Sequence, residues 1–356
     1  MDLFRQDRLA GTLLGAAVND ASGVAAAHAG LVANALSRAR LHDGGDGAGA
    51  DQVASTFRRA LIGWALRHPW AADADTLHAC GCIALGLRRT GTSAPTSGAA
   101  MRAAIIGAAF PFDVNRRCAV GHAVAEVTHT DPRSIDAALF VAEVAAGCVL
   151  SPANGDREAL ADRARGMVRA PELVVALHYA LELVEKKVTM GLAARELGVS
   201  NDATSAVPLA AFAFVRYGDT PRTAMEQLDT VVGVHARAPR AILGSWMGTL
   251  LGGACLPWNQ VARLRDGHFG PTHLRTLAAD LSEHVPAALL VQELAGSDPP
   301  VPGSSAPVSS SSAPAPSSSA PSARRPLPGL ARTTSRILPA GDALLAGGAS
   351  HKAAKH

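Results

Sequence analysis

The sequence predicts an all-α fold, a compact helical bundle, on three observations. Apolar residues recur at spacings of three and four, as in Leu9–Leu13 and Phe57–Leu61–Trp64, which is the period of an amphipathic helix. No run of alternating β-branched residues is long enough to indicate a sheet. The composition is 48% hydrophobic but only 4% aromatic, because alanine, the best helix former, supplies much of the apolar content.

Helical periodicity continues in eight further stretches. They are 71–89, 98–109, 116–129, 132–150, 156–185, 203–217, 220–232 and 239–255. Three of them start near good capping residues: Asp73, Asp131 before Pro132, and Thr220 before Pro221. A short polar side chain there accepts a hydrogen bond from a free N–H group of the first turn, and proline fits that turn because its missing N–H is not needed. The pattern predicts one helical domain over residues 1–296.

The composition changes near residue 297. Residues 301–323 contain ten Ser, five Pro and five Ala. Such a segment cannot bury enough apolar surface to offset the entropy lost on ordering. We therefore expect a helical domain over residues 1–296 and a disordered Ser/Pro/Ala-rich tail over residues 297–356. The basic residues of the tail could contact an acidic partner, and a passive solvated tail is the alternative.

Charge and composition exclude several classes of protein. The net charge is +3, but residues 297–356 hold six Lys or Arg and two Asp, so residues 1–296 carry 27 basic and 28 acidic residues. A balanced domain argues against nucleic-acid binding, which usually needs a basic face. No apolar run is long enough for a membrane helix, and the charged start is not a signal peptide. Five cysteines do not form a disulfide framework. We therefore expect a cytoplasmic protein with no nucleic-acid or membrane partner.

Two local patterns look like binding motifs. Residues 190–205 resemble a helix-turn-helix with its turn at Gly198, but the residues after the turn carry no positive charge for a DNA groove. A buried helical hairpin is the simpler interpretation. Cys80 and Cys82, with His78 nearby, supply too few ligands for zinc and would point in different directions on one helix. We interpret both cysteines as buried helix residues.

Several short motifs follow one another in a fixed order over about residues 5–260. They are DRLAG at Asp7–Gly11, GAAVNDASG at Gly15–Gly23, SGAAMR at Ser97–Arg102, VTHTDP at Val127–Pro132, AVPLA at Ala206–Ala210, the glycines Gly244, Gly248, Gly252 and Gly253, and LPW at Leu256–Trp258. In this order and at these distances they resemble the ADP-ribosylglycohydrolase family. The resemblance implies an all-α fold, two Mg²⁺ or Mn²⁺ ions in a cleft, and cleavage of the bond that joins ADP-ribose to a protein or a small molecule. It also implies that the partner is an ADP-ribose-like small molecule or an ADP-ribosylated protein.

The resemblance places the metal and catalytic groups at positions that this chain has largely replaced. The first anchor keeps Asp20, but the glutamate expected after it falls near Ala27. The second anchor reads Ala50-Asp51-Gln52-Val53, so Asp51 and Gln52 are the candidate metal ligands, and Asp51 and Asp20 are the candidate catalytic residues. Mg²⁺ and Mn²⁺ need about six oxygen ligands, several of them carboxylates, and two adjacent dications need still more negative charge. These residues are too few to hold two ions.

Arginines stand where the last metal carboxylates are expected. No Asp lies between Asp229 and Asp266, and Arg237 and Arg240 occupy the aligned segment. An arginine there would repel a metal ion and could neutralise Asp51. We therefore hypothesise that a salt bridge from Arg237 or Arg240 to Asp51 replaces the metal cluster.

The ligand-binding side is better preserved. Gly98 and the residues after it would present backbone N–H groups at a helix start, which is a general site for phosphate. The resemblance assigns ligand contacts to Ser97, Gly98, Met101, Arg102, Thr128 and His129. Four of them have a structural alternative. Gly98 could be only a loop glycine, Met101 a core residue, Arg102 a surface charge, and His129 a hydrogen-bonded helix end.

The recurrence of Gly244, Gly248 and Gly252 at every fourth position predicts a glycine face for close helix packing. Structural anchors are thus kept while metal ligands are lost, which favours a pseudoenzyme that binds ADP-ribose-like ligands or acts in regulation. One alternative is a divergent hydrolase of an N- or O-glycosidic bond in an ADP-ribosyl or nucleoside substrate. It would use Asp51 or Asp20 as the general base, with His42, Asp43 and Asp46 nearby. A second alternative is a structural or interaction protein with a closed pocket.

Overall fold

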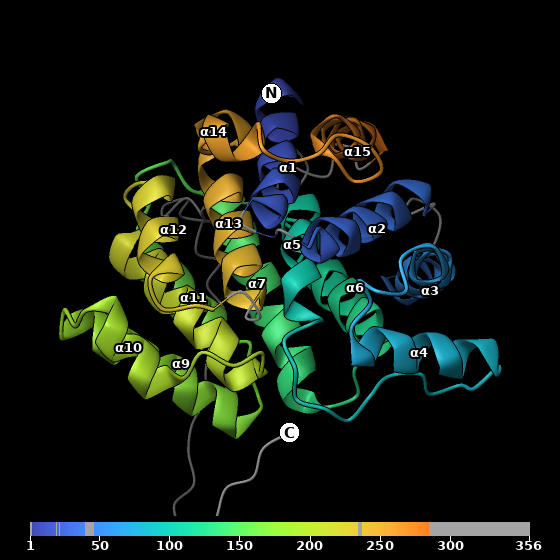
Figure 1. Ribbon diagram of the computed structural model, residues 1–356, viewed down its shortest axis with the longest axis horizontal. Coiled ribbons are helices and arrows are strands. Elements are labelled where there is room, and N and C mark those ends of the chain that lie inside the picture. Colours follow the sequence, from blue (N-terminus) through green and yellow to red (C-terminus); the bar gives the residue numbers. More distant parts are fainter. Residues whose placement is uncertain (1, 19, 21, 40–45, 234–236, 285–356) are drawn as a thin grey trace, which may run out of the picture. The chain divides into compact units, whose positions relative to one another are not determined.

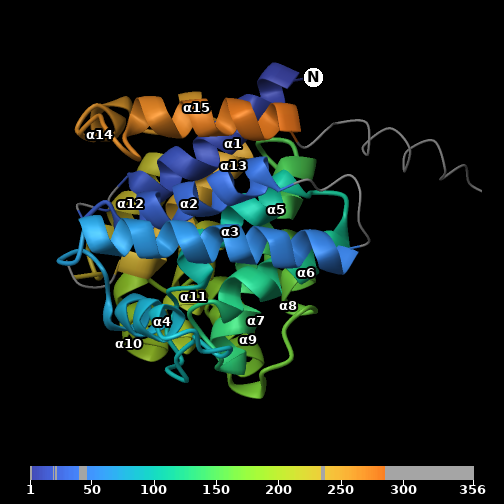
Figure 2. The same ribbon diagram turned by 90° about the vertical axis from the view of Figure 1, so that its right-hand side faces the viewer.

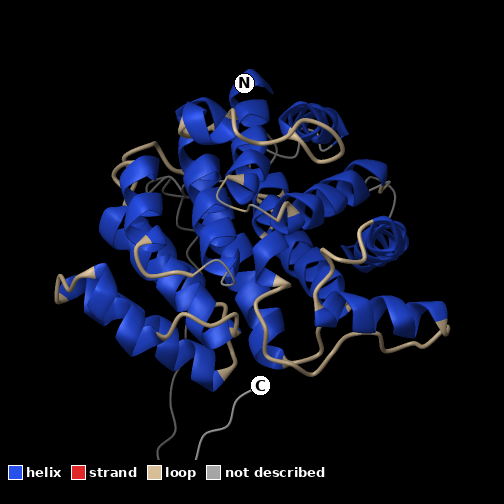
Figure 3. Cartoon of the chain, in the orientation of Figure 1, coloured by secondary structure: helices blue, strands red, loops and turns tan. Residues whose placement is uncertain are grey.

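Fifteen α-helices and two short 3₁₀ helices form the part of the chain that the computed structural model describes, which is residues 2–18, 20, 22–39, 46–233 and 237–284 (Figure 1). The first half holds α1 (Asp2–Ala17), α2 (Val24–Arg38), α3 (Asp46–Arg67), α4 (Ala74–Ala84), η1 (Ala100–Arg102), α5 (Ala104–Ala109), α6 (Val114–Glu126) and α7 (Pro132–Leu150). The second half holds α8 (Arg157–Arg165), α9 (Pro171–Glu185), α10 (Met190–Leu197), α11 (Ala203–Tyr217), α12 (Pro221–Asp229), α13 (Arg237–Leu251), η2 (Gly253–Cys255), α14 (Trp258–Val261) and α15 (Pro271–His284). No strand occurs among these residues (Figure 3), which confirms the predicted all-α class.

The core is built around α7, α11 and α13. Trp246 of α13 is fully buried, and its indole N–H donates to the carbonyl oxygen of Val141 over 3.0 Å. The rings of Phe140 and Phe214 lie 6.0 and 5.4 Å from the Trp246 ring. Because the polar N–H is satisfied and aromatic rings surround the indole, this large side chain fixes how the three helices pack.

The predicted glycine face joins α13 to α1. A Cβ atom added at Gly248 would overlap the carbonyl oxygen of Gly11, and one added at Gly244 would overlap that of Gly15. The two backbones therefore touch, and no other residue type fits between them. Beside this contact the hydroxyl groups of Thr12 and Thr249 lie 2.8 Å apart in the buried interface.

Most predicted helices are present, and two of them have the predicted bounds, 132–150 and 203–217. The stretch 156–185 is wrong as one helix, because Gly166 ends α8 and Pro171 begins α9. The Asp136 carboxylate accepts the N–H groups of Arg169 and Ala170 between them, over 2.7 and 2.6 Å. The stretch 71–89 ends early, at Ala84.

Three helices of the described part of the chain, α2, α14 and α15, were not predicted. Most side chains of α2 are buried, so it shows little of the polar–apolar period that identifies a surface helix. The residues expected to form the tail, 297–356, lie outside the described part of the chain.

The two local patterns are parts of the helical fold. In the pair α10 and α11, the helix after Gly198 is buried from Ala206 to Phe214, so it cannot enter a DNA groove. Cys80 and Cys82 lie on α4 and are half-buried rather than buried. None of the described helices is long and apolar enough to cross a membrane.

The candidate site lies on the side of the bundle formed by α2, α3, α4 and α6. Figure 2 shows α3 crossing this side, with α2 and α6 packed against it. An extended segment connects α4 to η1 and runs past the end of α6. Isolated β-bridges pair its Thr92 with His129 and its Thr96 with Asp202.

Candidate functional site

A chain of hydrogen bonds runs through the residues to which the resemblance assigns ligand binding. Arg102 of η1 donates to Thr128 Oγ1, which lies 2.7 Å from His129 Nδ1. On the other side of the ring, His129 Nε2 lies 2.7 Å from Thr96 Oγ1 and 3.5 Å from Asp75 Oδ2. The Thr96 hydroxyl donates to Asp75 Oδ2 over 2.5 Å. The chain links a buried cation to a carboxylate whose side chain is 18% exposed.

One set of proton positions satisfies every bond of this chain. A guanidinium has only donors, so Thr128 Oγ1 accepts from Arg102 and its own proton goes to His129 Nδ1. His129 Nε2 then carries the proton and donates to Thr96 Oγ1, whose hydroxyl donates to Asp75. A neutral His129 ring in this network carries its proton on Nε2. All the donors point from Arg102 towards Asp75, so each bond polarises the next.

Asp75 is the accessible end of the chain. It lies in the first turn of α4, whose N-terminus is capped by Asp73 through a 2.8 Å bond from the Thr76 N–H. The contact with His129, together with the bond from Thr96, holds the pKa of Asp75 below its usual range despite partial burial. Asp75 is therefore ionised at neutral pH. In this state it can accept hydrogen bonds from hydroxyl groups, but it has no proton to donate as a general acid.

Arg102 is the buried end of the chain. Its side chain is 2% exposed, and it also donates to the carbonyl oxygens of Gly98 and Val124, over 3.0 and 3.2 Å. Its guanidinium carbon lies 5.0 Å from the centre of the Phe57 ring. Burial lowers the pKa of Arg102 to about 10, against the opposing effect of Asp73, so the group keeps its charge at neutral pH.

His28 of α2 is a second buried imidazole in this region. It is 1% exposed and packs edge-on against Trp64, with 4.9 Å between ring centres. Neither of its nitrogens has a hydrogen-bond partner among the described residues. Burial, together with the positive charge of Arg102, lowers the pKa of His28 to about 4. His28 is therefore neutral at pH 7 and holds an unused donor and acceptor.

The remaining residues of the predicted ligand loop fix its position. The N–H and hydroxyl groups of Ser97 both donate to the carbonyl oxygen of Asn201, over 2.8 and 2.7 Å. Met101 is buried in the core. Gly98 faces His129, because a Cβ atom there would lie 3.0 Å from His129 Cε1. The structure thus brings Gly98, Arg102, Thr128 and His129 together and uses Ser97 and Met101 as anchors. Arg102 is buried, so the surface-charge alternative for it is wrong.

Asp20 caps a helix. Its Oδ1 accepts from the N–H of Ser22, over 3.1 Å, and from the Ser22 hydroxyl, and its Oδ2 accepts from the N–H of Ala25 over 2.6 Å. The carboxylate is 6% exposed. A carboxylate here satisfies free N–H groups and the positive end of the α2 dipole. Both oxygens of Asp20 are therefore already engaged.

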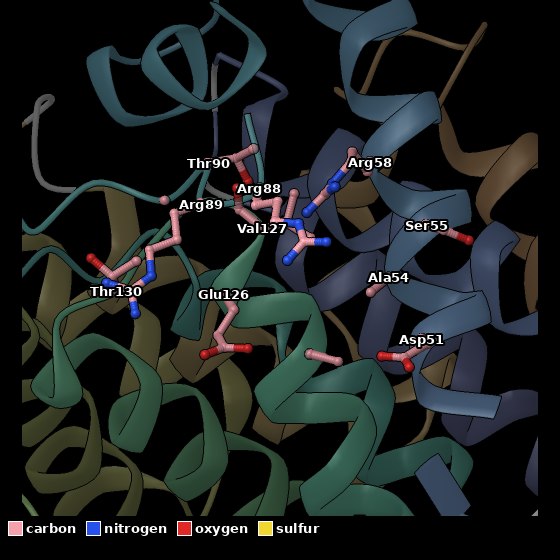
Figure 4. Close-up of a pocket in the computed structure, with 12 residues that line it drawn as sticks. Asp51, Ala54, Ser55, Arg58, Arg88, Arg89, Thr90, Glu126, Val127 and Thr130 are labelled. Atoms are coloured by element: carbon pink, nitrogen blue, oxygen red, sulfur yellow. Dashed lines mark hydrogen bonds between the residues drawn. The ribbon is translucent and has the colours of Figure 1, made fainter. Parts of the chain in front are cut away.

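Asp51 and Gln52 lie on the exposed face of α3. Asp51 lines a pocket of 590 Å³ between α3, the segment 88–91 and the end of α6, opposite Glu126 (Figure 4). Within the described ranges, no three His, Cys, Asp or Glu side chains lie close enough together to hold a metal ion. These residues therefore do not fit the two Mg²⁺ or Mn²⁺ ions that the resemblance implies. His42 and Asp43 lie outside the described residues.

The hypothesis of a salt bridge from Arg240 to Asp51 is wrong. Arg240 Nε donates to Asp229 Oδ1 over 2.5 Å, and its other nitrogens donate to the carbonyl oxygens of Val232 and Gly233, over 2.7 and 3.0 Å. Arg240 thus ties the start of α13 to the end of α12. Arg237 lies close enough to His28 to contribute to its lowered pKa.

The sequence reasoning missed Asp75, Thr96 and His28. None of them belongs to a motif, and Asp75 and Thr96 meet His129 only because the segment before η1 folds back along α6. The one available signal was the Asp73 cap, which places Asp75 in the first turn of a helix.

Comparison with known proteins defines the class to which this fold and site belong. The family model described as ADP-ribosylglycohydrolase matches residues 1–288. The chain therefore belongs to the ADP-ribosylglycohydrolase family. Among solved structures, a chain of an "ADP-ribosylglycohydrolase-related protein complex" is similar with a TM-score of 0.60 and 19% identity, over 79% of this chain and 99% of that one. No curated protein sequence matches this chain.

Proposed function

We propose that this chain is a pseudoenzyme of the ADP-ribosylglycohydrolase family that binds an ADP-ribose-like ligand, free or on a protein, without metal and without hydrolysing it. The engagement of Asp20 carries the proposal. One of its oxygens accepts from Ser22 and the other from Ala25 in the first turn of α2, and the described residues offer no group of three metal ligands. Two adjacent dications cannot be held without several carboxylates. A role in recognition or regulation in the cytoplasm follows, and five free cysteines agree with a reducing compartment.

The experiment separates ligand binding from metal-dependent chemistry. Thermal unfolding is followed with ADP-ribose in EDTA, and again with Mg²⁺ or Mn²⁺. In parallel, release of ADP-ribose from an ADP-ribosylated protein is measured. A ligand that binds only the folded state raises the melting temperature, so we expect stabilisation by ADP-ribose that is the same with and without metal, and no release. Metal-dependent release would overturn the proposal. No stabilisation in either condition would favour a structural or interaction protein with a closed pocket.

A second candidate function is hydrolysis without metal, and the Asp75–Thr96–His129 arrangement favours it. An ionised carboxylate held by an imidazole N–H group and a hydroxyl could orient water or a ribose hydroxyl. In this case ADP-ribose would be released in EDTA, and Asp75→Asn would abolish the release. Thr276→Val, which changes an exposed hydroxyl on α15, serves as the control.

A further inference from the structure

The pocket lined by Asp51 beside α3 also contains three arginines, Arg58, Arg88 and Arg89. None of them belongs to the hydrogen-bonded chain from Arg102 to Asp75. The volume of the pocket is 590 Å³, within the range of about 300–1,000 Å³ that is typical of small-molecule sites. Its charged and hydroxyl-bearing lining includes Asp51, Ser55, Arg58, Arg88, Arg89 and Glu126. None of the six predicted ligand residues lines it. The pocket thus adjoins the predicted ligand residues without including them, and of the predicted site residues it is lined by Asp51.

The arginines of this pocket have no anionic partner among the described residues. No ion pair or side-chain hydrogen bond involves Arg58, Arg88 or Arg89 in that part of the chain. Figure 4 shows the side chains of Arg58 and Arg88 extending towards the same part of the pocket. The Nε atom of Arg58 is buried and has no hydrogen-bond partner. A buried donor without an acceptor is costly, so the Arg58 Nε–H needs an acceptor, and a bound anion would supply one.

The two exposed arginines of the pocket, Arg88 and Arg89, lie at the start of a segment that is held in place by hydrogen bonds. Thr90 follows them, is 1% exposed, and donates from its hydroxyl to the carbonyl oxygen of Val127 over 2.8 Å. Two residues further on, the N–H of Thr92 donates to Thr128, and the N–H of Thr130 donates back to Thr92, over 2.9 and 2.7 Å. The start of the segment is therefore held against the end of α6. Arg88 and Arg89 are kept at the pocket by these backbone bonds rather than by ion pairs of their own.

We propose that this pocket binds the phosphate groups of a nucleoside diphosphate, either free or as part of an ADP-ribose-type ligand. Guanidinium groups present forked donors that match phosphate oxygens, and several arginines around one pocket suit a diphosphate. The carboxylates of Asp51 and Glu126 would repel phosphate but accept hydrogen bonds from sugar hydroxyls. Together they favour a ligand that has both groups. The nucleoside and ribosyl parts of this assignment rest on the proposed function, whereas the phosphate part does not.

Calorimetric titration in EDTA at fixed ionic strength tests the assignment. The probes are inorganic diphosphate, ADP, ADP-ribose and adenosine. We expect ADP and ADP-ribose to bind, and adenosine to bind at least about tenfold more weakly because charge-assisted hydrogen bonds to phosphate are lost. The difference in affinity between ADP and inorganic diphosphate gives the contribution of the nucleoside. The difference in affinity between ADP and ADP-ribose gives the contribution of the second ribose.

Matched variants assign the binding to this pocket. Arg58→Gln, and Arg88→Gln combined with Arg89→Gln, should each weaken ADP binding at least about tenfold. Arg59→Gln is the control, since Arg59 is the exposed neighbour of Arg58 and does not line the pocket. It should change binding less than about twofold, as expected for an isolated surface charge. Glu126→Gln should strengthen binding of inorganic diphosphate, because it removes a like charge from the pocket.

The assignment is overturned if ADP does not bind, or if the Arg58 and Arg59 variants bind it equally well. Its failure is distinct from failure of the proposed function. If ADP-ribose stabilises the protein but the pocket arginines have no effect, the pseudoenzyme proposal stands and the ligand lies elsewhere. If Mg²⁺ triggers release of ADP-ribose, the pseudoenzyme proposal fails, and the arginine variants still decide where the phosphates bind.

Discussion

His129 and Asp75 are joined through the hydroxyl group of Thr96, which lies 2.7 Å from the imidazole Nε2 and 2.5 Å from the carboxylate Oδ2. Asp75 comes from the first turn of α4 and His129 follows the end of α6, so this bridge fastens α4 to the rest of the site. Because the ring is 1% exposed, the bridge also supplies the partner that its Nε2–H group needs in the interior.

Removing this hydroxyl should destabilise the protein. Thr96→Val keeps the shape of the side chain but leaves the His129 Nε2–H without its closest acceptor, at a cost of about 1–3 kcal/mol in the free energy of unfolding. Urea denaturation measures this loss. Thr276→Val, at an exposed position of α15, should change stability by less than about 0.5 kcal/mol. Equal stability of the two variants would mean that the bridge contributes nothing.

His28 should make stability depend on pH. Its pKa is lowered from 6.5 to about 4, so the unfolded chain binds a proton in this range while the folded protein does not. Acidification from pH 7 through 6.5 therefore removes stability, by about 3 kcal/mol once the pH is below 4, and raising the pH restores it. At pH 5 the loss from this group should be about 2 kcal/mol.

Variants that cannot titrate isolate the contribution of His28. In His28→Phe and His28→Leu the fall in unfolding free energy between pH 7 and pH 5 should be smaller than in the unmodified protein by about 2 kcal/mol, whatever their stability at pH 7. His178→Gln, at a histidine that is 59% exposed, should keep the full dependence. An unchanged slope in the His28 variants would show that this group is not held neutral by burial.

The sequence predicted those parts of the fold that depend on local chemistry. The bounds 132–150 follow from the Asp131 cap and Pro132 at the start, and the glycine face of α13 follows from a four-residue spacing. The break between α8 and α9 was missed although Gly166 and Pro171 are local signals for it. The sequence does not show that Asp136, about thirty residues earlier, accepts the N–H groups of the turn.

The candidate site was less predictable for the same reason. Motifs located Arg102, Thr128 and His129, but Asp75 and Thr96 join them only through tertiary folding. The hypothesis for Arg240 failed because alignment placed it at a metal position, whereas its actual partner, Asp229, lies at the end of the preceding helix. The carboxylate that Arg240 binds, Asp229, lies only eleven residues earlier in the chain, whereas the hypothesis had named the distant Asp51.

Asp20 and Asp51 should respond differently to substitution. Asp20→Ala removes the acceptor of the Ser22 and Ala25 N–H groups at the start of α2 and should cost about 0.5–2 kcal/mol of unfolding free energy, equally with and without Mg²⁺. Asp51→Ala changes an exposed side chain and should stay within about 0.5 kcal/mol. Chemical denaturation in EDTA and in Mg²⁺ measures both. A Mg²⁺-dependent difference at either position would contradict the view that these carboxylates hold no metal.

The contact between α1 and α13 should be the least tolerant of added volume. In Gly248→Ala the new methyl group would occupy the position of the Gly11 carbonyl oxygen, so one backbone must move. Overpacking of this kind should cost about 3 kcal/mol or more, and separation of the helices would also break the Thr12–Thr249 hydrogen bond. Gly244→Ala, one turn earlier and against Gly15, should behave in the same way.

Gly81→Ala adds the same methyl group as Gly248→Ala but should stabilise the protein instead of destabilising it. Gly81 lies in α4, and a Cβ atom there meets nothing within 4 Å. Alanine loses less backbone entropy on folding than glycine, so this variant should gain about 0.5–1 kcal/mol. Melting temperatures of the two variants, measured side by side, should therefore shift in opposite directions. If Gly248→Ala were tolerated as well as Gly81→Ala, the two backbones could not be in contact, and the glycine spacing that identified this helix pair would have no structural meaning.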